Sequence, residues 1–557
     1  MLTTATWVYL ALGICCAGLV WKLWCWFSWE VGPAQEGVGP AARAAASIGA
    51  MIRALFSPKI GPIIKAFVLD GLIQRRVWRH SRLAWLAHML IFWGFVLLVL
   101  MHALGEQITA AIWPDYSPTL NPYLFLRNLF GAMVLVGAIL AVVRRSRPGQ
   151  MRAVTRGIDI FALVLVGVII LSGFCLEGLK MTSYKSFARM AEEYAPSDEP
   201  ADINALKAWW MVHYGVVFPE DQRPVLNQKI IEQGHQLDAD SCVECHSSPR
   251  WAFLSYPLSR LLAPVSVGLV KGGGENALYY IHFFACLLGL ALLPWTKFLH
   301  LITSPLVMTI NAVAERDKMS PAVLASLQAL ELDACTHCAT CTVHCSVGIA
   351  IKKVPNQLLL PSEKLLGMRK MGRLAKTQDQ ALAMLREGAD ICTMCYRCTQ
   401  LCPVGINLQE LWNSLKARLE ALGWAPTTRA VAEEAAEQAA KERKEEIVFN
   451  PEFRKSLKAS AQGRTFSHCF QCITCSNSCP VVKAYEDPKA ELDMLPHQLM
   501  RAVALGMKHE AMGARMVWSC LTCYMCQEAC PQGVRVTDVI LELRSLAAQA
   551  ILPERRG

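Results

Sequence analysis

Sixteen of the 23 cysteines in this 557-residue sequence fall into four runs with the spacing C-x2-C-x2-C-x3-C. The runs are Cys335, Cys338, Cys341 and Cys345, then Cys392, Cys395, Cys398 and Cys402, then Cys469, Cys472, Cys475 and Cys479, and finally Cys520, Cys523, Cys526 and Cys530. Three close thiolates and a fourth farther along have the ligand spacing of cubane iron–sulfur clusters. Structural zinc or scattered buried thiols do not explain four such repeats. The sequence therefore predicts four [4Fe–4S] clusters.

In runs of this kind the first three cysteines hold one cluster and the fourth ligates the neighbouring cluster, as in bacterial ferredoxins. Crossed ligation assigns Cys335, Cys338, Cys341 and Cys402 to one cluster, and Cys392, Cys395, Cys398 and Cys345 to the next. It assigns Cys469, Cys472, Cys475 and Cys530 to a third cluster, and Cys520, Cys523, Cys526 and Cys479 to the fourth. We expect two double-cluster modules, at 311–423 and 456–557, with a helical linker at 424–455.

Four histidines lie in or beside two long apolar stretches: His88 and His102 near 84–105, and His282 and His300 near 277–298. In a helix, the first two are separated by a rotation of about −40° and a rise of about 21 Å, and the last two by five turns and about 27 Å. Each pair then shares one helix face. In antiparallel helices, His102 meets His282 near the outer surface, and His88 meets His300 near the inner one. Because neutral imidazole is an axial ligand of haem iron, the register predicts two b-type haems; the alternative is interfacial or hydrogen-bonded histidines.

The run Cys242-Val243-Glu244-Cys245-His246 has the spacing for covalent attachment of a c-type haem, with two thioether cysteines and a proximal histidine. A chance match or half of a zinc site is the alternative. The candidates for the distal ligand are His213, His235 and Met211. We favour His213, because it lies in an aromatic segment beside Trp209 and Trp210.

These residues need a membrane scaffold, and the composition supplies one. Hydrophobic residues make up 54% of the chain, and the mean hydropathy is +0.30. Apolar stretches long enough to cross a bilayer occur near 6–27, 84–105, 123–143, 158–178 and 277–298. The formal net charge of +10 comes largely from basic residues beside these stretches, so nucleic acid is not an expected partner.

The distribution of basic residues predicts the orientation of the five spans. The loop after the first span has eight Lys or Arg residues and the loop after the third has five, whereas the segment between the second and third has none. The positive-inside rule then places the N-terminus outside, residues 179–276 in an external loop, and the cysteine-rich half in the cytoplasm. The first span lacks a basic segment before it, so we expect it to be retained and not cleaved as a signal peptide.

The paired histidines, the five spans and the ending Pro294-Trp295-Thr296-Lys297-Phe298-Leu299-His300 resemble the dihaem cytochrome b subunit of respiratory nitrate reductase, and still more its relatives in heterodisulfide reductase and sulfite-reduction complexes. The resemblance covers about residues 1–305, and the long external loop departs from it. The widely spaced cysteine runs resemble the helical ferredoxin of heterodisulfide reductase and anaerobic glycerol-3-phosphate dehydrogenase subunits. The implied fold is mainly α: a five-helix membrane bundle at 1–310 followed by two helical ferredoxin modules.

The resemblance implies electron transfer between menaquinone or ubiquinone and the clusters, in a bacterial or archaeal cytoplasmic membrane. Glu106, Arg127 and Glu177 are the polar groups closest in sequence to the level of the outer haem, and the two glutamates are candidate proton acceptors for quinol. The alternative is that the glutamates are ordinary interfacial charges. No G-x-G-x-x-G or G-x-x-x-x-G-K-[ST] run appears, so we expect the cytoplasmic catalytic site in a partner, a flavoprotein or a heterodisulfide-reductase-like subunit. One alternative is electron transfer from a periplasmic cytochrome c without a quinone site. Another is a redox sensor or scaffold, which would need one cluster and not four.

Overall fold

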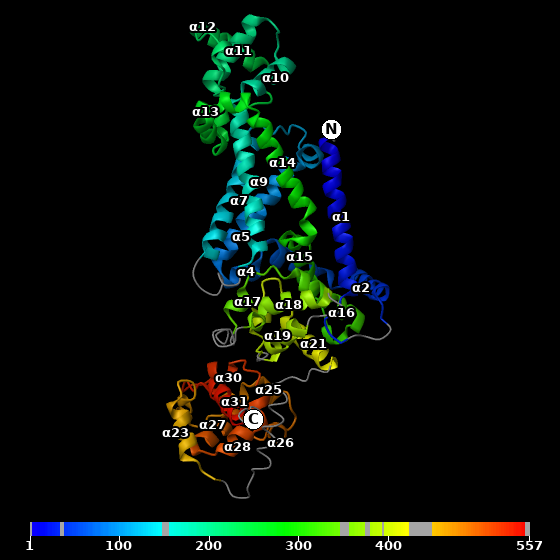
Figure 1. Ribbon diagram of the computed structural model, residues 1–557, viewed down its shortest axis with the longest axis vertical. Helices are drawn as coiled ribbons and strands as arrows, with labels where there is room; N and C mark the ends of the chain where they lie inside the picture. The colour runs from blue at the N-terminus through cyan, green and yellow to red at the C-terminus, as the bar shows by residue number, and fades with distance from the viewer. Residues whose placement is uncertain are drawn as a thin grey trace. The chain divides into compact units, whose positions relative to one another are not determined.

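The computed structural model describes residues 3–33, 38–146, 155–345, 356–373, 379–390, 392, 395–422 and 448–551. Helices dominate these residues, which contain no β-strand beyond one isolated bridge between Ser183 and Val217 (Figure 1). The prediction of a mainly α chain is confirmed. Most of the predicted linker, 424–447, lies outside the described residues.

Among the residues that the structure describes, four helices are long and apolar enough to cross a membrane. They are α1 (Thr4–Ser28), α5 (Arg82–Leu98) with its continuation η2 (Val99–Ala103), α7 (Tyr123–Ser146) and α9 (Gly157–Thr182). Each coincides with one of the first four predicted spans, which makes the chain membrane-associated. The fifth predicted span, 277–298, corresponds to α14 (Gly274–Ala291) and the short turns η6 (Leu293–Trp295) and η7 (Lys297–Leu299). Its helix ends where Pro294 cannot donate a backbone hydrogen bond, and the count of five spans stays a prediction.

The chain divides into two compact units, Met1–Leu23 with Phe67–Ile302, and Trp24–Ala66 with Thr303–Gly557. In the first unit, α5 packs closely along α7, and α9 packs against α7 and α14. A Cβ on Gly94 would lie 2.7 Å from the carbonyl oxygen of Phe130, and one on Gly137 would lie 2.7 Å from that of Ala87. Glycine at both positions therefore lets α5 and α7 approach more closely than larger residues would allow.

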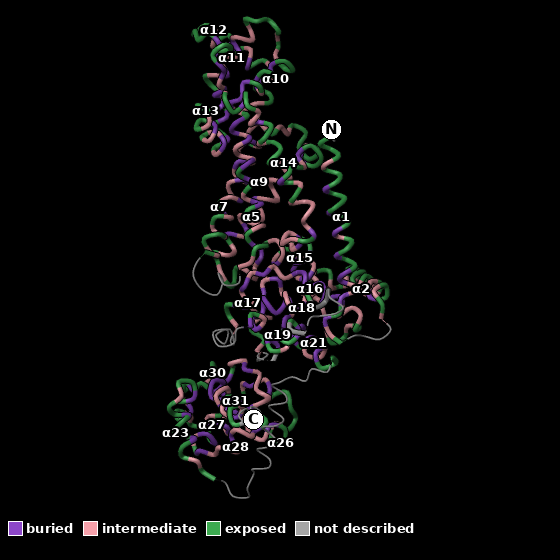
Figure 2. Tube along the Cα trace, viewed as in Figure 1, coloured by how far each residue is buried: buried purple, intermediate pink, exposed green. Residues whose placement is uncertain are grey.

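The segment predicted as an external loop is largely helical. It contains α10 (Tyr184–Tyr194), α11 (Pro200–His213), α12 (Gln228–Ser241) and α13 (Ser255–Lys271). Phe187, Leu206, Trp210 and Phe218 are buried together in its core, which Figure 2 shows as purple stretches within these helices. Glu275 at the start of α14 fixes α10 by accepting hydrogen bonds from Ser183, Ser186 and Arg189.

In the second unit, the end of α1 and the helix α2 (Pro40–Leu55) belong with the first cysteine-rich module. Trp26 donates a 2.9 Å hydrogen bond from Nε1 to Asp333, on α16 (Pro321–Ala334), and α2 packs against α16. Residues 24–66 thus group by their contacts with the cysteine-rich part of the chain, and the predicted domain bounds stay a prediction. The rest of this module contains α15 (His300–Asn311), α17 (Thr340–Val343), α18 (Pro361–Arg373), α19 (Asp379–Asp390), α20 (Arg397–Gln400) and α21 (Leu408–Ala421).

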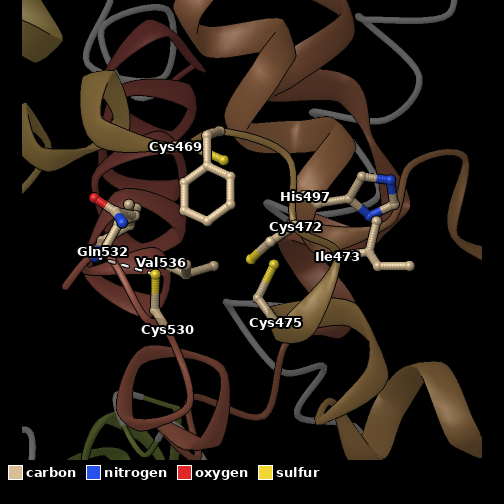
Figure 3. A pocket seen from close by; sticks show the side chains of 10 residues that line it. Cys469, Cys472, Ile473, Cys475, His497, Cys530, Gln532 and Val536 are labelled. Atoms are coloured by element: carbon tan, nitrogen blue, oxygen red, sulfur yellow. Dashed lines mark hydrogen bonds between the residues drawn. The ribbon is translucent and has the colours of Figure 1, made fainter.

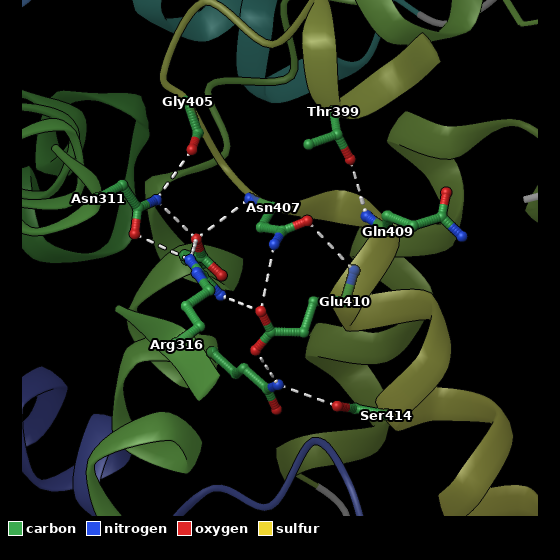
Figure 4. Close-up of polar contacts among 10 residues, drawn as sticks. Asn311, Arg316, Thr399, Gly405, Asn407, Gln409, Glu410 and Ser414 are labelled. Atoms are coloured by element: carbon green, nitrogen blue, oxygen red, sulfur yellow. Dashed lines mark hydrogen bonds and ion pairs between the residues drawn. The ribbon is translucent and has the colours of Figure 1, made fainter. Parts of the chain in front are cut away.

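A buried ionic network joins three helices of this module (Figure 4). Arg316 contacts Glu331 on α16 at 2.5 Å and Glu410 on α21 at 2.6 Å. Asn311, the last residue of α15, donates from its amide to Glu331 and to the carbonyl oxygen of Gly405, each at 2.8 Å. The network thus connects the end of α15 to the module through charged groups that are shielded from water.

The second module has its own core of Phe466, Leu499, Val503, Val517 and Ile540. Its helices include α23 (Pro451–Ala459), α24 (Thr474–Asn477), α25 (Pro480–Lys483), α26 (Pro488–Leu492), α27 (Pro496–Leu505), α28 (Lys508–Gly513), α29 (Arg515–Ser519), α30 (Met525–Glu528) and α31 (Val536–Ile551). The helices α24 and α30 are single turns, each within a cysteine run.

Candidate functional site

One pocket of the second module is lined by the four cysteines that crossed ligation assigns to a single cluster. Cys469, Cys472 and Cys475 come from the turn that enters α24, and Cys530 comes from the turn after α30. Their sulfur atoms face one common space in Figure 3. The rest of the lining includes the apolar side chains of Phe470, Ile473, Val534 and Val536. This sulfur-lined, largely apolar site fits a [4Fe–4S] cluster.

A second pocket, in the first module, repeats this arrangement. It is lined by Cys335, Cys338, Cys341 and Cys402, again the set that crossed ligation assigns to one cluster. The turns in both modules require left-handed backbone, with φ of 52° at His337 and 63° at Ala339 in the first, and 67° and 58° at Gln471 and Ile473 in the second. These bends bring three cysteines close together in sequence to one side of a pocket.

The other two predicted ligand sets are described less completely. Cys479 is buried beside Cys520, in an apolar cluster with Val481, Leu492 and Met516. The structure thus brings the fourth cysteine of one run to the first cysteine of the other, as crossed ligation requires. Cys345, Cys392, Cys395 and Cys398 are described, but much of the chain next to them lies outside the described residues.

The candidate ligands need a cation to hold them as thiolates. Burial raises the pKa of the Cys402 thiol to about 12 and that of Cys475 to about 11. These thiols are neutral near pH 7, so binding of iron must displace their protons. Backbone N–H groups point at other sulfurs, from Val534 to Cys530 at 3.3 Å and from Thr522 to Cys520 at 3.4 Å. Such donors stabilise thiolate charge and influence cluster potential.

Sequence patterns did not single out the buried pair His337 and Glu363. His337 Nε2 lies 2.6 Å from Glu363 Oε1, and both side chains are almost fully buried. His337 lines the pocket of the first module, directly before Cys338. A histidine inside a cysteine run was the available signal, but its partner lies on α18 and is recognised only in the folded chain.

The four membrane histidines lie in the two pairs that the helical register predicts. The ring centroids of His88 and His300 are 6.0 Å apart, and those of His102 and His282 are also 6.0 Å apart. A ligating nitrogen lies about 2 Å from a first-row metal ion and its ring centroid about 1 Å farther, so two axial imidazoles on one iron have centroids about 6 Å apart. Both separations therefore fit one iron held between two imidazoles.

Hydrogen bonds at Nδ1 orient two of these rings. His282 Nδ1 lies 3.0 Å from the carbonyl oxygen of Ile169, and His300 Nδ1 contacts that of Lys297. A proton held on Nδ1 by a carbonyl leaves Nε2 as the ligating atom. His102 differs, because its Nδ1 lies 3.3 Å from the guanidinium of Arg127. Ligation through Nε2 of His102 would put the proton on Nδ1, which could then no longer accept a hydrogen bond from Arg127, so Arg127 would have to turn away. Glu177, 4.0 Å from Arg127, is an anionic partner for the displaced guanidinium.

The predicted c-type haem motif borders the aromatic core of the helical segment 179–276. Cys242 is buried and Cys245 is exposed, and the ring of His246 lies 5.4 Å from that of Trp210. Asp238 accepts hydrogen bonds from Trp209 and Trp210, each at 2.9 Å. Burial and this carboxylate raise the pKa of the Cys242 thiol to about 12. The apolar surroundings suit a haem, and one of the two cysteines is open to solvent.

Two of the three candidate distal ligands lie beside the ring of Trp209 on α11. His213 stacks on Trp209 with ring centroids 3.6 Å apart, and His235 lies 4.4 Å from the same ring. Met211 is packed against the core. Among the described contacts, none joins His213 to His246, so the choice of His213 stays a prediction.

The two candidate proton acceptors have different surroundings. Glu177 accepts a 3.0 Å hydrogen bond from Asn128 and a short one from Ser255 at the start of α13. Glu106 is exposed in η3 (Gly105–Thr109). The structure therefore brings Glu177 to Arg127, which contacts His102, and gives Glu106 no comparable setting among the described residues.

Comparison with known proteins identifies the class of the cysteine-rich half. Residues 330–406 and 465–534 each match the family described as a 4Fe-4S dicluster domain. Together these segments contain all four cysteine runs. The two segments are thus similar to iron–sulfur dicluster domains, which supports iron–sulfur clusters and electron transfer in general.

Similar curated proteins include heterodisulfide reductase subunits. One subunit of the H(2):CoB-CoM heterodisulfide,ferredoxin reductase of Methanothermobacter thermautotrophicus is 35% identical over 113 residues, which are 20% of this chain and 57% of that protein. One subunit of the dihydromethanophenazine:CoB–CoM heterodisulfide reductase of Methanosarcina thermophila is 29% identical over 125 residues, 21% of this chain and 47% of its own length. The chain spans about half the length of these relatives. No solved structure matches.

Proposed function

We propose that this chain moves electrons across a membrane, from a quinol to a cytoplasmic oxidoreductase. The observation that carries the proposal is the register of the four histidines, whose two facing pairs have the spacing of axial ligands. When bound, haems at these pairs and [4Fe–4S] clusters in the modules supply one-electron carriers. His102 and His282 would hold the outer haem, and His88 and His300 the inner one.

Chain continuity supports a direct connection from the inner histidine pair to the first cluster. His300 begins α15, and Ser304 lies one helical turn later. Ser304 Oγ lies 3.5 Å from the carbonyl oxygen of Ala334, the residue before Cys335. Along the chain, only a short part of α15 therefore joins a proposed haem ligand to the module that contains Cys335.

Glu177 is the proposed proton acceptor beside the outer histidine pair. Quinol oxidation releases two electrons and two protons, so a base must lie close to the electron acceptor. Arg127 lies 4.0 Å from Glu177 and 3.3 Å from His102 Nδ1, so Glu177 is one side chain away from the outer pair and could hold Arg127 once it turns away from His102. Ser255 donates a hydrogen bond to Glu177 from the start of α13. Oxidising quinol on the outer side and moving electrons inward would be electrogenic, with each charge worth about 2.3 kcal/mol per 100 mV.

The names of the similar proteins support a cytoplasmic oxidoreductase as the partner that accepts the electrons. The similar proteins are named as subunits of heterodisulfide reductases, so a heterodisulfide-reductase-like subunit or a flavoprotein would complete the cytoplasmic reaction. The second candidate function, electron entry from a periplasmic cytochrome c, is favoured by the CxxCH motif at the edge of an aromatic core.

Anaerobic mixing of the oxidised protein with a reduced menaquinone analogue tests the proposal. We expect the haem α-bands to appear first and cluster absorbance to bleach afterwards. The matched experiment uses a reduced soluble cytochrome c as donor. Reduction by the cytochrome alone would defeat the quinol proposal and favour the second candidate.

A further inference from the structure

The helix α2 exposes an apolar face. Ile48, Met51, Ile52, Leu55 and the following Phe56 are all exposed, Ile52 to 51% and Phe56 to 89%. Residues three, four and seven positions apart share one side of a helix, so these side chains form one continuous surface, here called the α2 apolar face. A patch of this kind on a helix is a site of interaction with something apolar.

The opposite side of α2 is fixed to the protein. Arg43 is buried and donates hydrogen bonds to the carbonyl oxygen of Trp29 at 2.9 Å and of Trp26 at 3.3 Å. Its Nε also reaches Ser326 on α16 at 3.5 Å. Since Trp26 lies in the last turn of α1 and Trp29 directly follows it, α2 begins beside the end of a helix that can span a membrane.

Other helices of the same unit show the reverse pattern. On α27, Leu499, Met500 and Val503 are fully buried, and the charged Arg501 is exposed. On α21, Leu411 and Leu415 are fully buried. The helices α21 and α27 therefore bury their apolar side chains in the cores of their modules. Because the α2 apolar face is exposed, we infer that it contacts an apolar partner.

A lipid surface fits that partner. The stretch from residue 38 to residue 69 contains Arg43, Arg53, Lys59 and Lys65 but no Asp or Glu. Arg53 and Lys65 are exposed. Basic residues beside an apolar helix face are the combination that binds the anionic headgroup region of a bilayer. Because α2 is attached to the end of α1, a helix that can span a membrane, α2 would lie at the level of the headgroups.

We propose that α2 and Phe56 form an interfacial helix that inserts its apolar face into the surface of an anionic membrane. The helix would then hold the first dicluster module, to which Arg43 and Trp26 attach it, against the bilayer. This role does not depend on which molecule donates electrons, so it can fail or hold separately from the quinol proposal.

Photo-crosslinking of the full chain tests the proposal. p-Benzoylphenylalanine would be incorporated at Phe56, the protein reconstituted in nanodiscs containing phosphatidylglycerol and phosphatidylcholine, and adducts identified by mass spectrometry after irradiation. We expect lipid adducts at Phe56. The matched control is the same substitution at Phe449, which is 58% exposed but lies two residues before α23, and we expect it to give none.

Two further substitutions keep the test decisive. If the Phe56 variant does not assemble, the probe at Ile52 reports on the same face. Arg53→Gln with Lys65→Gln should reduce the share of phosphatidylglycerol among the adducts, whereas Arg501→Gln should leave it unchanged. Equal lipid labelling at Phe56 and Phe449, or adducts at Phe56 only with protein, would overturn the proposal.

Discussion

The imidazole rings of His88 and His300 face one another with centroids 6.0 Å apart and planes inclined by 72°. The contact of His300 Nδ1 with the carbonyl oxygen of Lys297 leaves Nε2 of that ring for a metal. Substituting His88 and substituting His300 should therefore have the same effect on haem content. Because a bis-histidine iron needs both imidazoles, the effects of single substitutions must follow the spatial pairs.

Single histidine substitutions should remove haems pairwise. We expect His88→Ala or His300→Ala to remove the inner haem, and His102→Ala or His282→Ala the outer one. Haem content and redox titration of the α-bands would measure the loss, with His344→Ala, an exposed histidine outside the pairs, as the control. If His88→Ala and His282→Ala deleted the same haem, the pairing would be wrong.

The cysteine pockets predict crossed effects on the clusters. The purified protein should contain about sixteen cluster iron atoms, and Cys402→Ser should perturb the same cluster as Cys335→Ser. Electron paramagnetic resonance of the reduced protein would identify the missing signal, and iron and sulfide analysis would measure the loss. Cys16→Ser, at an exposed cysteine of α1, should keep all signals. A Cys402→Ser spectrum matching that of Cys392→Ser would contradict the crossing.

The CxxCH motif predicts one covalent haem. In cells competent for c-type maturation, the full-length band should stain for haem after denaturing electrophoresis, and Cys245→Ala should lose most of the stain because a thioether is removed. His102→Ala should keep the stain, since it concerns a non-covalent site. Absence of stain from the unsubstituted protein would remove the c-haem claim.

Glu177 and Glu106 should differ in quinol oxidation. Glu177→Gln should slow reduction of the haems by menaquinol by about 10²-fold or more, the range of a lost general base, while Glu106→Gln has little effect. Stopped-flow absorbance measures both rates, and full reduction by dithionite would show that the haems are intact. Unchanged kinetics, even in the double variant, would move the quinol site towards the inner haem or favour the cytochrome c route.

The Arg316 network predicts a large loss of stability. Arg316→Met leaves Glu331, a fully buried carboxylate, without its cation, which costs about 3–5 kcal/mol in comparable buried pairs. Thermal bleaching of cluster absorbance and hydrogen exchange of α16 would report the loss. Adding Glu331→Gln should recover part of it, because the unpaired charge is gone. Equal stability of Arg316→Met and the unsubstituted protein would show that the network contributes little.

The helical class, the first four apolar helices and the pairing of the four membrane histidines could be predicted from sequence alone. Helical periodicity and hydropathy are local properties, so α1, α5, α7 and α9 lie where the apolar stretches predict them. Likewise, the spacing of His88 and His102 on one helix fixes which side each faces, and antiparallel helices then determine the pairs. Spacing within a cysteine run likewise predicts that three cysteines lie on one side of a common pocket, as they do in both modules.

Tertiary structure decided the contacts that join distant segments. No local pattern connects His337 to Glu363, Arg127 to His102, or Arg43 to the end of α1, because each contact depends on how separate helices pack. The segment 179–276 was predicted only as a loop, since its short helices bury a core that hydropathy averages conceal. Residues 24–66 resemble membrane-flanking sequence by charge, yet Trp26 and Arg43 attach them to the first dicluster module. Local sequence does not specify which residues on other helices these side chains will contact. Those contacts are determined by how the helices pack in the folded chain.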